Sequence, residues 1–386
     1  MDILFIALFI FIGFLFINSF KASLSSFDIS TLQKLFVYHL LFGLYYCLFI
    51  RGDAYGHWMV AKSFSTEDFI FNFTQSQGSY FSYALNYIPS NVLGLSYFTG
   101  TILYSLIGFI GLTYFYIIAV KYVPFNSKFG NYNLFPLLFF SPSLHFWSCA
   151  VGKDTLLFFC IGIFMYGILK PIKRLPMIIL GLTLAYFIRP HMTLFMLLAY
   201  AAAYFTTSKV SFFQRIVFFG LLIGVSFFIL PSVMKFAKVE DSTLESFNDF
   251  AESKSFLLSR STVGSAIDIS SYPFPLKVVT FLYRPLFFDA HNVMGIFVSI
   301  ENLFLVFLSI KIIRNKPLQA YRKAPFVIQG MVWFLIIGTL AFSQSLGNLG
   351  IMIRMRNMFL PGMLIFILWT FSYRQQLLKG KNNKMS

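Results

Sequence analysis

Long apolar runs separated by short polar segments dominate the pattern of this chain. Runs long enough to cross about 30 Å of hydrocarbon occur at eleven places: 3–20, 35–50, 92–120, 134–151, 155–169, 175–188, 192–206, 216–237, 292–313, 326–343 and 359–373. A further apolar piece, 276–288, is short and broken by Arg284 and Pro285, which favours an interfacial or re-entrant element. The pattern predicts an all-α polytopic membrane protein of about 11 transmembrane helices, with a single transmembrane domain over 1–386.

The charges between these runs indicate which side of the membrane each loop faces. With the segment from residue 374 onward placed in the cytoplasm, the cytoplasmic loops hold 18 of the 30 Lys and Arg residues and a single acid, Asp28. The other acids fall outside, except Glu301, which lies within a span. Because basic loops stay cytoplasmic, we expect an outside N-terminus, a cytoplasmic C-terminus and two larger outer loops, at about 51–91 and 238–291.

Composition excludes several classes of protein. With 58% hydrophobic residues, 53 Phe and 11% charged residues, the chain is not a soluble globule. The net charge of +16 is scattered singly and in pairs between apolar runs, so it indicates topology and not a nucleic-acid surface. No GxxxxGK[ST] motif and no paired-Asp nucleotide-sugar site occurs in the cytoplasmic loops. The start, MDILFIALF, lacks the features of a cleaved signal, and the three cysteines, without metal spacing, are expected to be buried thiols: Cys47, Cys149 and Cys160.

The outer ends of the spans carry the charged residues that look functional. The segment SPSLHFWSCAVGKD ends an apolar run in a polar tip that contains Lys153 and Asp154. Arginine is disfavoured on the outer side by topology, and guanidinium binds phosphate bidentately. We therefore interpret five arginines as a cationic lining for phosphate: Arg51, Arg189, Arg284, Arg354 and Arg356. The alternative is that each reaches to lipid headgroups as an anchor, and that Lys153 and Asp154 form only a surface pair.

The remaining candidates are histidines and one acid. His191 and His291 lie beside an arginine or an acid and, with His57, are candidate substrate-binding residues. His39 and His145 are expected to be structural. Glu301 lies inside a span, where a charge costs about 2.5 to 3.5 kcal/mol, so we expect it to act on substrate. Its alternative role is a hydrogen bond to a neighbouring helix, made when protonated or with the help of Asn302.

One stretch resembles a known superfamily. RGDAYGHWMVAKS, from residue 51, resembles the first outer loop of GT-C superfamily glycosyltransferases, in which an acid followed by a tyrosine and an amphipathic helix lies at the active site. Four further segments look like those of polytopic proteins encoded in bacterial surface-polysaccharide clusters, described as capsule or O-antigen polymerase-like: SPSLHFWSCAVGKD, FIRPHMTLF, YRPLFFDAHNVMGIFVSIEN and GNLGIMIRMRNMFLP. These motifs cover about a fifth of the chain.

The resemblance implies roles for particular residues. Asp53 matches the catalytic acid, and Arg354 with Arg356 matches the basic pair before the last span. The chain departs from the pattern in two ways, since no second acid directly follows Asp53 and the large outer loop with paired arginines has no clear match. Many enzymes of this kind bind a divalent cation, but no metal-ligand motif is present, so the cofactor stays open.

The expected function is therefore the transfer or polymerisation of sugars from polyprenyl-(pyro)phosphate donors on the extracytoplasmic face of the bacterial cytoplasmic membrane. Asp53 is the candidate general base, with Asp154 and Asp289 in reserve. The expected partners are a lipid-linked donor, a glycan acceptor, the bilayer and other polysaccharide assembly proteins, and no nucleic acid. A transporter or flippase for a lipid-linked glycan or small anion is the main alternative, and a non-catalytic scaffold is the next.

Overall fold

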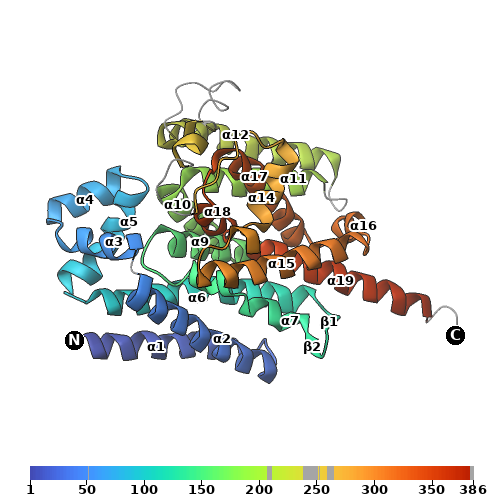
Figure 1. The fold of residues 1–386 in the computed structure, drawn as a ribbon, viewed down its shortest axis with the longest axis horizontal. Coiled ribbons are helices and arrows are strands. Elements are labelled where there is room, and N and C mark those ends of the chain that lie inside the picture. Colours follow the sequence, from blue (N-terminus) through green and yellow to red (C-terminus); the bar gives the residue numbers. More distant parts are fainter. Residues whose placement is uncertain (51, 207–210, 238–250, 252, 259–264, 383–386) are drawn as a thin grey trace. The chain divides into compact units, whose positions relative to one another are not determined.

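A computed structural model describes the chain except for residues 51, 207–210, 238–250, 252, 259–264 and 383–386. The described residues are helical almost throughout, and their two short strands, β1 (Lys128–Phe129) and β2 (Tyr132–Asn133), pair in an antiparallel hairpin. The chain, whose helices and strands are labelled in Figure 1, divides into two compact units. Unit 1 comprises residues 1–118 and 136–193, and unit 2 comprises 119–135 and 194–386.

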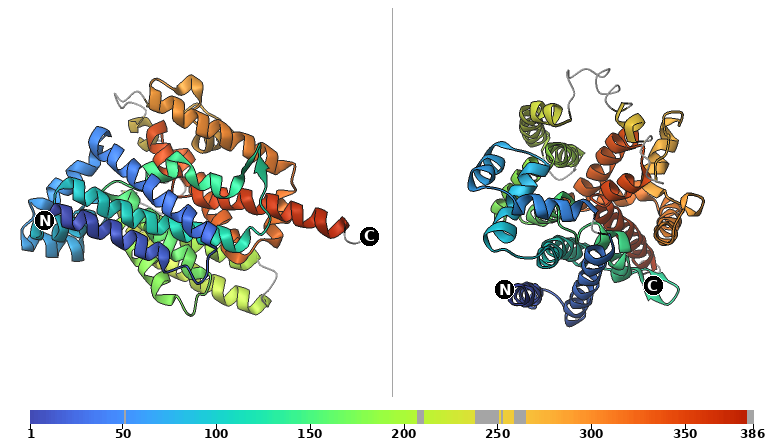
Figure 2. Two further views of the ribbon diagram at one scale, coloured as in Figure 1. Left: turned by 90° about the horizontal axis from the view of Figure 1, so that it is seen from below. Right: turned by 60° about the vertical axis from the view of Figure 1, so that its left-hand side comes forward.

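Unit 1 contains the first candidate residues, and its elements are α1 (Asp2–Asn18), α2 (Ser26–Tyr45), η1 (Tyr46–Ile50), α3 (Gly52–Lys62), α4 (Thr66–Gln75), α5 (Ser79–Tyr87), η2 (Ile88–Val92), most of α6 (Tyr97–Tyr122), the end of α7 (Leu134–Leu137), η3 (Leu138–Phe140), α8 (Pro142–Phe146), α9 (Lys153–Ile168) and α10 (Leu175–Ile188). α1 packs on α2, and Figure 2 shows these two helices in blue near the end marked N. The short helices α3 and α4 both pack on α5. α9 and α10 form an antiparallel hairpin.

Small residues let the helices of unit 1 approach closely. A Cβ atom added to Gly162 of α9 would lie 2.7 Å from the carbonyl oxygen of Gly111 in α6. On its other side, α9 meets Gly181 of α10, where an added Cβ would lie 2.8 Å from the Cys160 carbonyl oxygen. Such contacts between small residues are typical of helices packed within a membrane. They bury α9 between its neighbours and fix the position of its charged first turn.

Polar residues fix several helix starts in unit 1. Ser25 with Asp28, and Ser65 with Asp68, form capping boxes at the starts of α2 and α4. The hydrogen bonds from Ser65 hold the pKa of Asp68 below its ordinary value. Asp2 accepts hydrogen bonds from the Ser96 backbone and hydroxyl and from the Thr99 hydroxyl, so the first helix carries a cap for α6.

Unit 2 contains the other candidates, and its elements are most of α11 (Pro190–Thr206), α12 (Phe212–Ala237), α14 (Phe274–Tyr283), η4 (Phe287–Asp289), α15 (Val293–Ile313), α16 (Pro317–Lys323), α17 (Phe326–Ser345), α18 (Leu349–Arg356) and α19 (Leu360–Asn382). α17 packs on α14, α18 and α19. The ring of Phe359 fills the space over Gly338 of α17 and lies 4.7 Å from the ring of Phe334.

Among the described residues, five helices are long and apolar enough to cross a membrane: Ser26–Ile50, Tyr97–Tyr122, Phe212–Phe236, Val293–Ile313 and Phe326–Ser345. α18 and α19 together make a sixth, bent by 60°. The described chain is therefore all-α with several helices able to span a membrane, fewer by this measure than the eleven expected. The run 134–151 is not one helix as expected, because Pro136 and Pro142 divide it into the short pieces α7, η3 and α8.

Candidate functional site

Two of the candidate arginines occupy equivalent places at helix ends. Arg189 follows α10 and Arg284 follows α14, and each precedes a proline. A proline disfavours helical geometry in the residue before it, and both arginines are extended, with φ −152° and ψ 91° at Arg189 and φ −94° and ψ 154° at Arg284. The Arg-Pro pair thus ends the helix and leaves the guanidinium at the helix terminus.

In unit 1, the guanidinium of Arg189 binds Asp154. The Nη2 atom of Arg189 lies 2.8 Å from Oδ1 of Asp154, and the two side chains are only 12% and 11% exposed. Asp154 is in the first turn of α9, where the helix dipole favours a negative charge. The antiparallel hairpin of α9 and α10 brings these residues together although 35 positions separate them.

The next residue, Lys153, joins this hairpin to the start of α5. Its Nζ atom donates to the hydroxyl of Ser79 at 2.7 Å. The backbone N–H of Gly78 donates to the carbonyl of Phe187 at 2.8 Å, and the ring of Phe187 stacks on Phe81 at 5.0 Å. The structure therefore brings Lys153, Asp154 and Arg189 together with residues 78–81 of the expected outer loop. We call this set the hairpin cluster: Ser79, Lys153, Asp154 and Arg189.

The stretch that resembles the GT-C outer loop forms α3, which begins just before Asp53. Asp53 is exposed in the first turn of this helix. His57 is buried, with its ring 4.8 Å from that of Tyr83 in α5, and Trp58 is buried and donates to the Leu95 carbonyl. The helix expected after Asp53 is present, and one face is fixed on α5 while Asp53 remains open to solvent. Arg51 lies outside the described residues.

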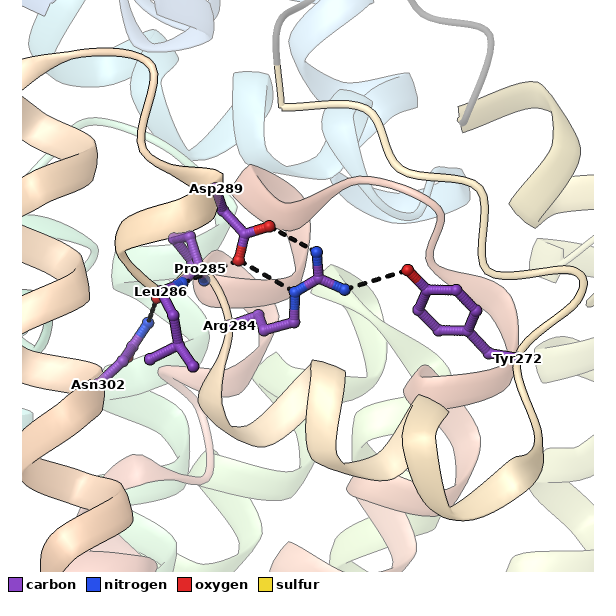
Figure 3. Close-up of polar contacts among 6 residues, drawn as sticks. All are labelled: Tyr272, Arg284, Pro285, Leu286, Asp289 and Asn302. Atoms are coloured by element: carbon purple, nitrogen blue, oxygen red, sulfur yellow. Dashed lines mark hydrogen bonds and ion pairs between the residues drawn. The ribbon is translucent and has the colours of Figure 1, made fainter.

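In unit 2, the guanidinium of Arg284 binds Asp289 through two parallel hydrogen bonds (Figure 3). Nε donates to Oδ2 at 3.0 Å and Nη2 to Oδ1 at 2.5 Å, with side chains 15% and 7% exposed. Nη1 donates to the Tyr272 hydroxyl at 3.3 Å. The hydrogen bonds from Arg284 to Asp289 raise the pKa of Arg284 above its ordinary value, so its guanidinium stays charged. We call these three residues the turn cluster.

Polar contacts also hold the backbone beneath the turn cluster. Asp289 Oδ2 accepts from the N–H of Leu286 at 2.9 Å, and Asn302 Nδ2 donates to the carbonyl of Pro285 at 2.7 Å. Figure 3 shows Asn302 reaching the turn from α15, on the opposite side of it from Tyr272. Sequence reasoning gave Asn302 only an assisting role beside Glu301, although a buried amide within an apolar helix is itself a signal of polar contact.

The other candidates of unit 2 differ in burial and in their contacts. Arg356 is 1% exposed and hydrogen-bonded to Asn302 and to the carbonyl of Leu282. Glu301 is half-buried and interacts electrostatically with Arg356. Arg354 is half-buried on α18, and His291 is exposed before α15. In unit 1, by contrast, His191 is half-buried at the start of α11.

Sequence reasoning missed a pair of buried histidines in unit 1. The Nδ1 atoms of His39 in α2 and His145 in α8 are 3.0 Å apart, and both side chains are fully buried. His145 Nε2 faces the Phe139 carbonyl at 2.8 Å and must donate to it. In neutral His145 the Nδ1 atom is then an acceptor, and His39 Nδ1 is its donor. No spacing rule in a single sequence pairs residues 106 positions apart.

These contacts bear on the chemistry each residue can perform. The carboxylates of Asp154 and Asp289 each hold a guanidinium, so accepting a proton would weaken an ion pair. Asp53 is the exposed carboxylate of the three candidates. No group of three or more His, Cys, Asp or Glu side chains suited to a metal ion occurs in the described part of the chain, and we assign no step to a metal. Comparison with protein-family models, with curated proteins and with solved structures gives no match to this chain.

Proposed function

We propose that this protein transfers or polymerises sugars from polyprenyl-(pyro)phosphate donors on the extracytoplasmic face of the bacterial cytoplasmic membrane, in the synthesis of a surface polysaccharide. The observation that carries the proposal is the repeated Arg–Asp arrangement, with Arg189 on Asp154 and Arg284 on Asp289 at the ends of apolar helices. A planar guanidinium held at such a helix end suits a lipid-linked phosphate, because two of its N–H groups match two phosphate oxygens.

The proposed reaction is a displacement at the anomeric carbon of the donor sugar. The acceptor hydroxyl oxygen forms the new bond to this carbon while the bond to the phosphate oxygen breaks. The carboxylate of Asp53 takes the hydroxyl proton as general base. The phosphate leaves with the bonding electrons, and Lys153 and Arg189 of the hairpin cluster stabilise its charge.

The proposal includes the topology derived from the charges. Eleven spans with the N-terminus outside and the C-terminus inside place Asp53, the hairpin cluster and the turn cluster on the side where lipid-linked sugars are used. Among the described residues, five or six apolar helices are long enough to cross a membrane, which supports placing the protein in a membrane; the number of spans and their orientation belong to the proposal. Nucleotide sugars stay in the cytoplasm, so a donor on the outer side is carried by a lipid.

Transfer in detergent tests the proposal directly. Purified protein receives lipid-linked oligosaccharide extracted from cells that lack it, together with a glycan acceptor, and the glycan product is measured by gel mobility. We expect product with the natural chain, none with Asp53→Asn, and a small amount with Asp53→Glu, because a base needs its carboxylate. Wild-type product from Asp53→Asn would remove this residue from the reaction.

Transport of a lipid-linked glycan or small anion is the second candidate function. It is supported by the 60° bend between α18 and α19, since discontinuous spans form substrate sites in transporters. The same assay separates the two, because detergent abolishes compartments. A transporter gives no product in detergent but moves labelled donor across proteoliposomes, whereas a transferase gives product in both.

A further inference from the structure

Arg356 is the largest charged side chain that unit 2 buries completely. It ends α18, is 1% exposed, and directs its two terminal nitrogens in different directions. Nη1 donates to the carbonyl of Leu282 in the last turn of α14 at 2.5 Å. Nη2 donates to Oδ1 of Asn302 in α15 at 2.6 Å. A cation is favourable beside the carbonyls at a helix C-terminus, so Arg356 closes the end of α14.

Asn302 connects Arg356 to the backbone that follows Arg284. Because guanidinium has only donors, the amide must present its oxygen to Arg356, and its Nδ2 then points to a carbonyl. That carbonyl is Pro285, at 2.7 Å. Asn302 is itself fully buried. One network therefore holds the backbone before Arg284, at Leu282, and the backbone after it, at Pro285.

We propose that Arg356 and Asn302 are positioning residues for Arg284, and that they fix the turn from which Arg284 presents its guanidinium to a phosphate. This differs from the sequence expectation that Arg356 itself binds substrate, since Arg356 is 1% exposed and its terminal nitrogens bind Leu282 and Asn302, whereas the side chain of Arg284 is 15% exposed. The role of Arg284 as the phosphate ligand rests on the proposed function. The fixing of the turn does not.

The chemistry of the network predicts which replacements break it. Lysine carries one point charge on a flexible stem and cannot bridge the two acceptors as the planar fork does. Arg356→Lys and Asn302→Leu should therefore each release the turn. The double variant Arg356→Met with Asn302→Leu removes the buried guanidinium together with its amide partner, so neither of these two groups is left without the other, and much of the folded protein is recovered. The turn that carries Arg284 is then no longer held in this variant, so a loss of positioning can be measured without a loss of folded protein.

A nitroxide on the turn tests the positioning without reference to function. Phe287 is 51% exposed within η4, and Phe287→Cys in a cysteine-free background accepts the label. We expect a single-component spectrum in this background and an added mobile component in Arg356→Lys, Asn302→Leu and the double variant. Ser299→Ala is the matched control, because Ser299 is buried on the same helix and bonds only within it, to the Gly295 carbonyl. Identical spectra in all variants would overturn the proposal.

Binding of a short-chain polyprenyl phosphate then tests the connection to Arg284. We expect affinity at least tenfold lower in Arg356→Lys, in Asn302→Leu and in the well-folded double variant, and unchanged in the Ser299→Ala control. Full affinity in the double variant, despite a mobile turn, would overturn the role of the network in binding. If the natural chain does not bind the probe, the proposed function fails, while a mobile component in the nitroxide spectra still supports the fixing of the turn.

Discussion

The Asp154–Arg189 pair offers a quantitative prediction. Arg189→Met leaves the carboxylate of Asp154, whose side chain is 11% exposed, without its cation. Breaking a buried pair on one side costs about 3 to 5 kcal/mol, and the slight exposure of this pair favours the lower end. A loss of about 3 kcal/mol lowers the ratio of folded to unfolded protein about a hundredfold. Asp154→Leu removes the carboxylate that Arg189 binds and should lower the free energy of unfolding by a similar amount.

The double variant distinguishes the pair from two independent residues. With both charges gone, no unpaired ion remains, so Arg189→Met with Asp154→Leu should cost about 2 kcal/mol less than the sum of the single changes. The measurement is reversible unfolding of the purified protein in mixed micelles, titrated with sodium dodecyl sulfate and followed by tryptophan fluorescence. Asp154→Leu with Arg284→Met is the control, because Arg284 is bound to Asp289 instead. Costs that add within about 0.5 kcal/mol in the first double variant would refute the coupling.

Three further predictions address packing, topology and pH. Gly108→Val should sharply reduce the amount of protein recovered from membranes, because even a Cβ atom at this position would overlap a backbone carbonyl of the segment before α9. Gly220→Val is the control and should not reduce recovery, because the space around Gly220 is open. Equal recovery of the two variants would contradict the packing. In a cysteine-free background, a cysteine at Ser76 should react with an impermeant maleimide in spheroplasts and one at Asn382 should not, and the reverse pattern would invert the proposed topology. The capping hydrogen bonds of Asp68 lower its pKa, so they should stabilise α4 fully above the ordinary pKa of about 3.9, and this stabilisation should be lost as the pH falls through the lower pKa of the folded state. Asp68→Asn should abolish this pH dependence, which amide exchange of α4 measures.

Local chemistry in the sequence accounts for much of the fold. Apolar runs predict the long helices, and the serines at 25 and 65 begin two helices through contacts only three residues away. The Arg284–Asp289 pair spans five residues, so its proximity follows from one turn. The run 134–151 was expected to form one helix because its residues are apolar, but its two prolines divide it into short helical pieces.

Contacts between distant segments could not be predicted in the same way. The sequence marked Asp154 and Arg189 as unusual and placed them on one side, but their pairing depends on the register of two packed helices. The same is true of His39 with His145, and of Arg356 with Asn302. In each case the packing of the helices determines which residues are in contact. Hydropathy predicts the helix face or helix end on which a residue lies, but not the residue that it contacts.

The shortness of α10 has a consequence for the lipid around the protein in the proposed topology. Its 14 residues extend about 21 Å, and Leu175, Ile179 and Leu180 are exposed along it. If α10 crosses the membrane, as the proposed topology has it, lipid against this face would meet an apolar surface about 9 Å shorter than a typical hydrocarbon core of about 30 Å. The bilayer would relieve this mismatch by thinning locally, which would draw headgroups toward the end of the helix that carries Arg189. The thickness of the surrounding membrane would then control how readily a lipid-borne phosphate reaches that guanidinium.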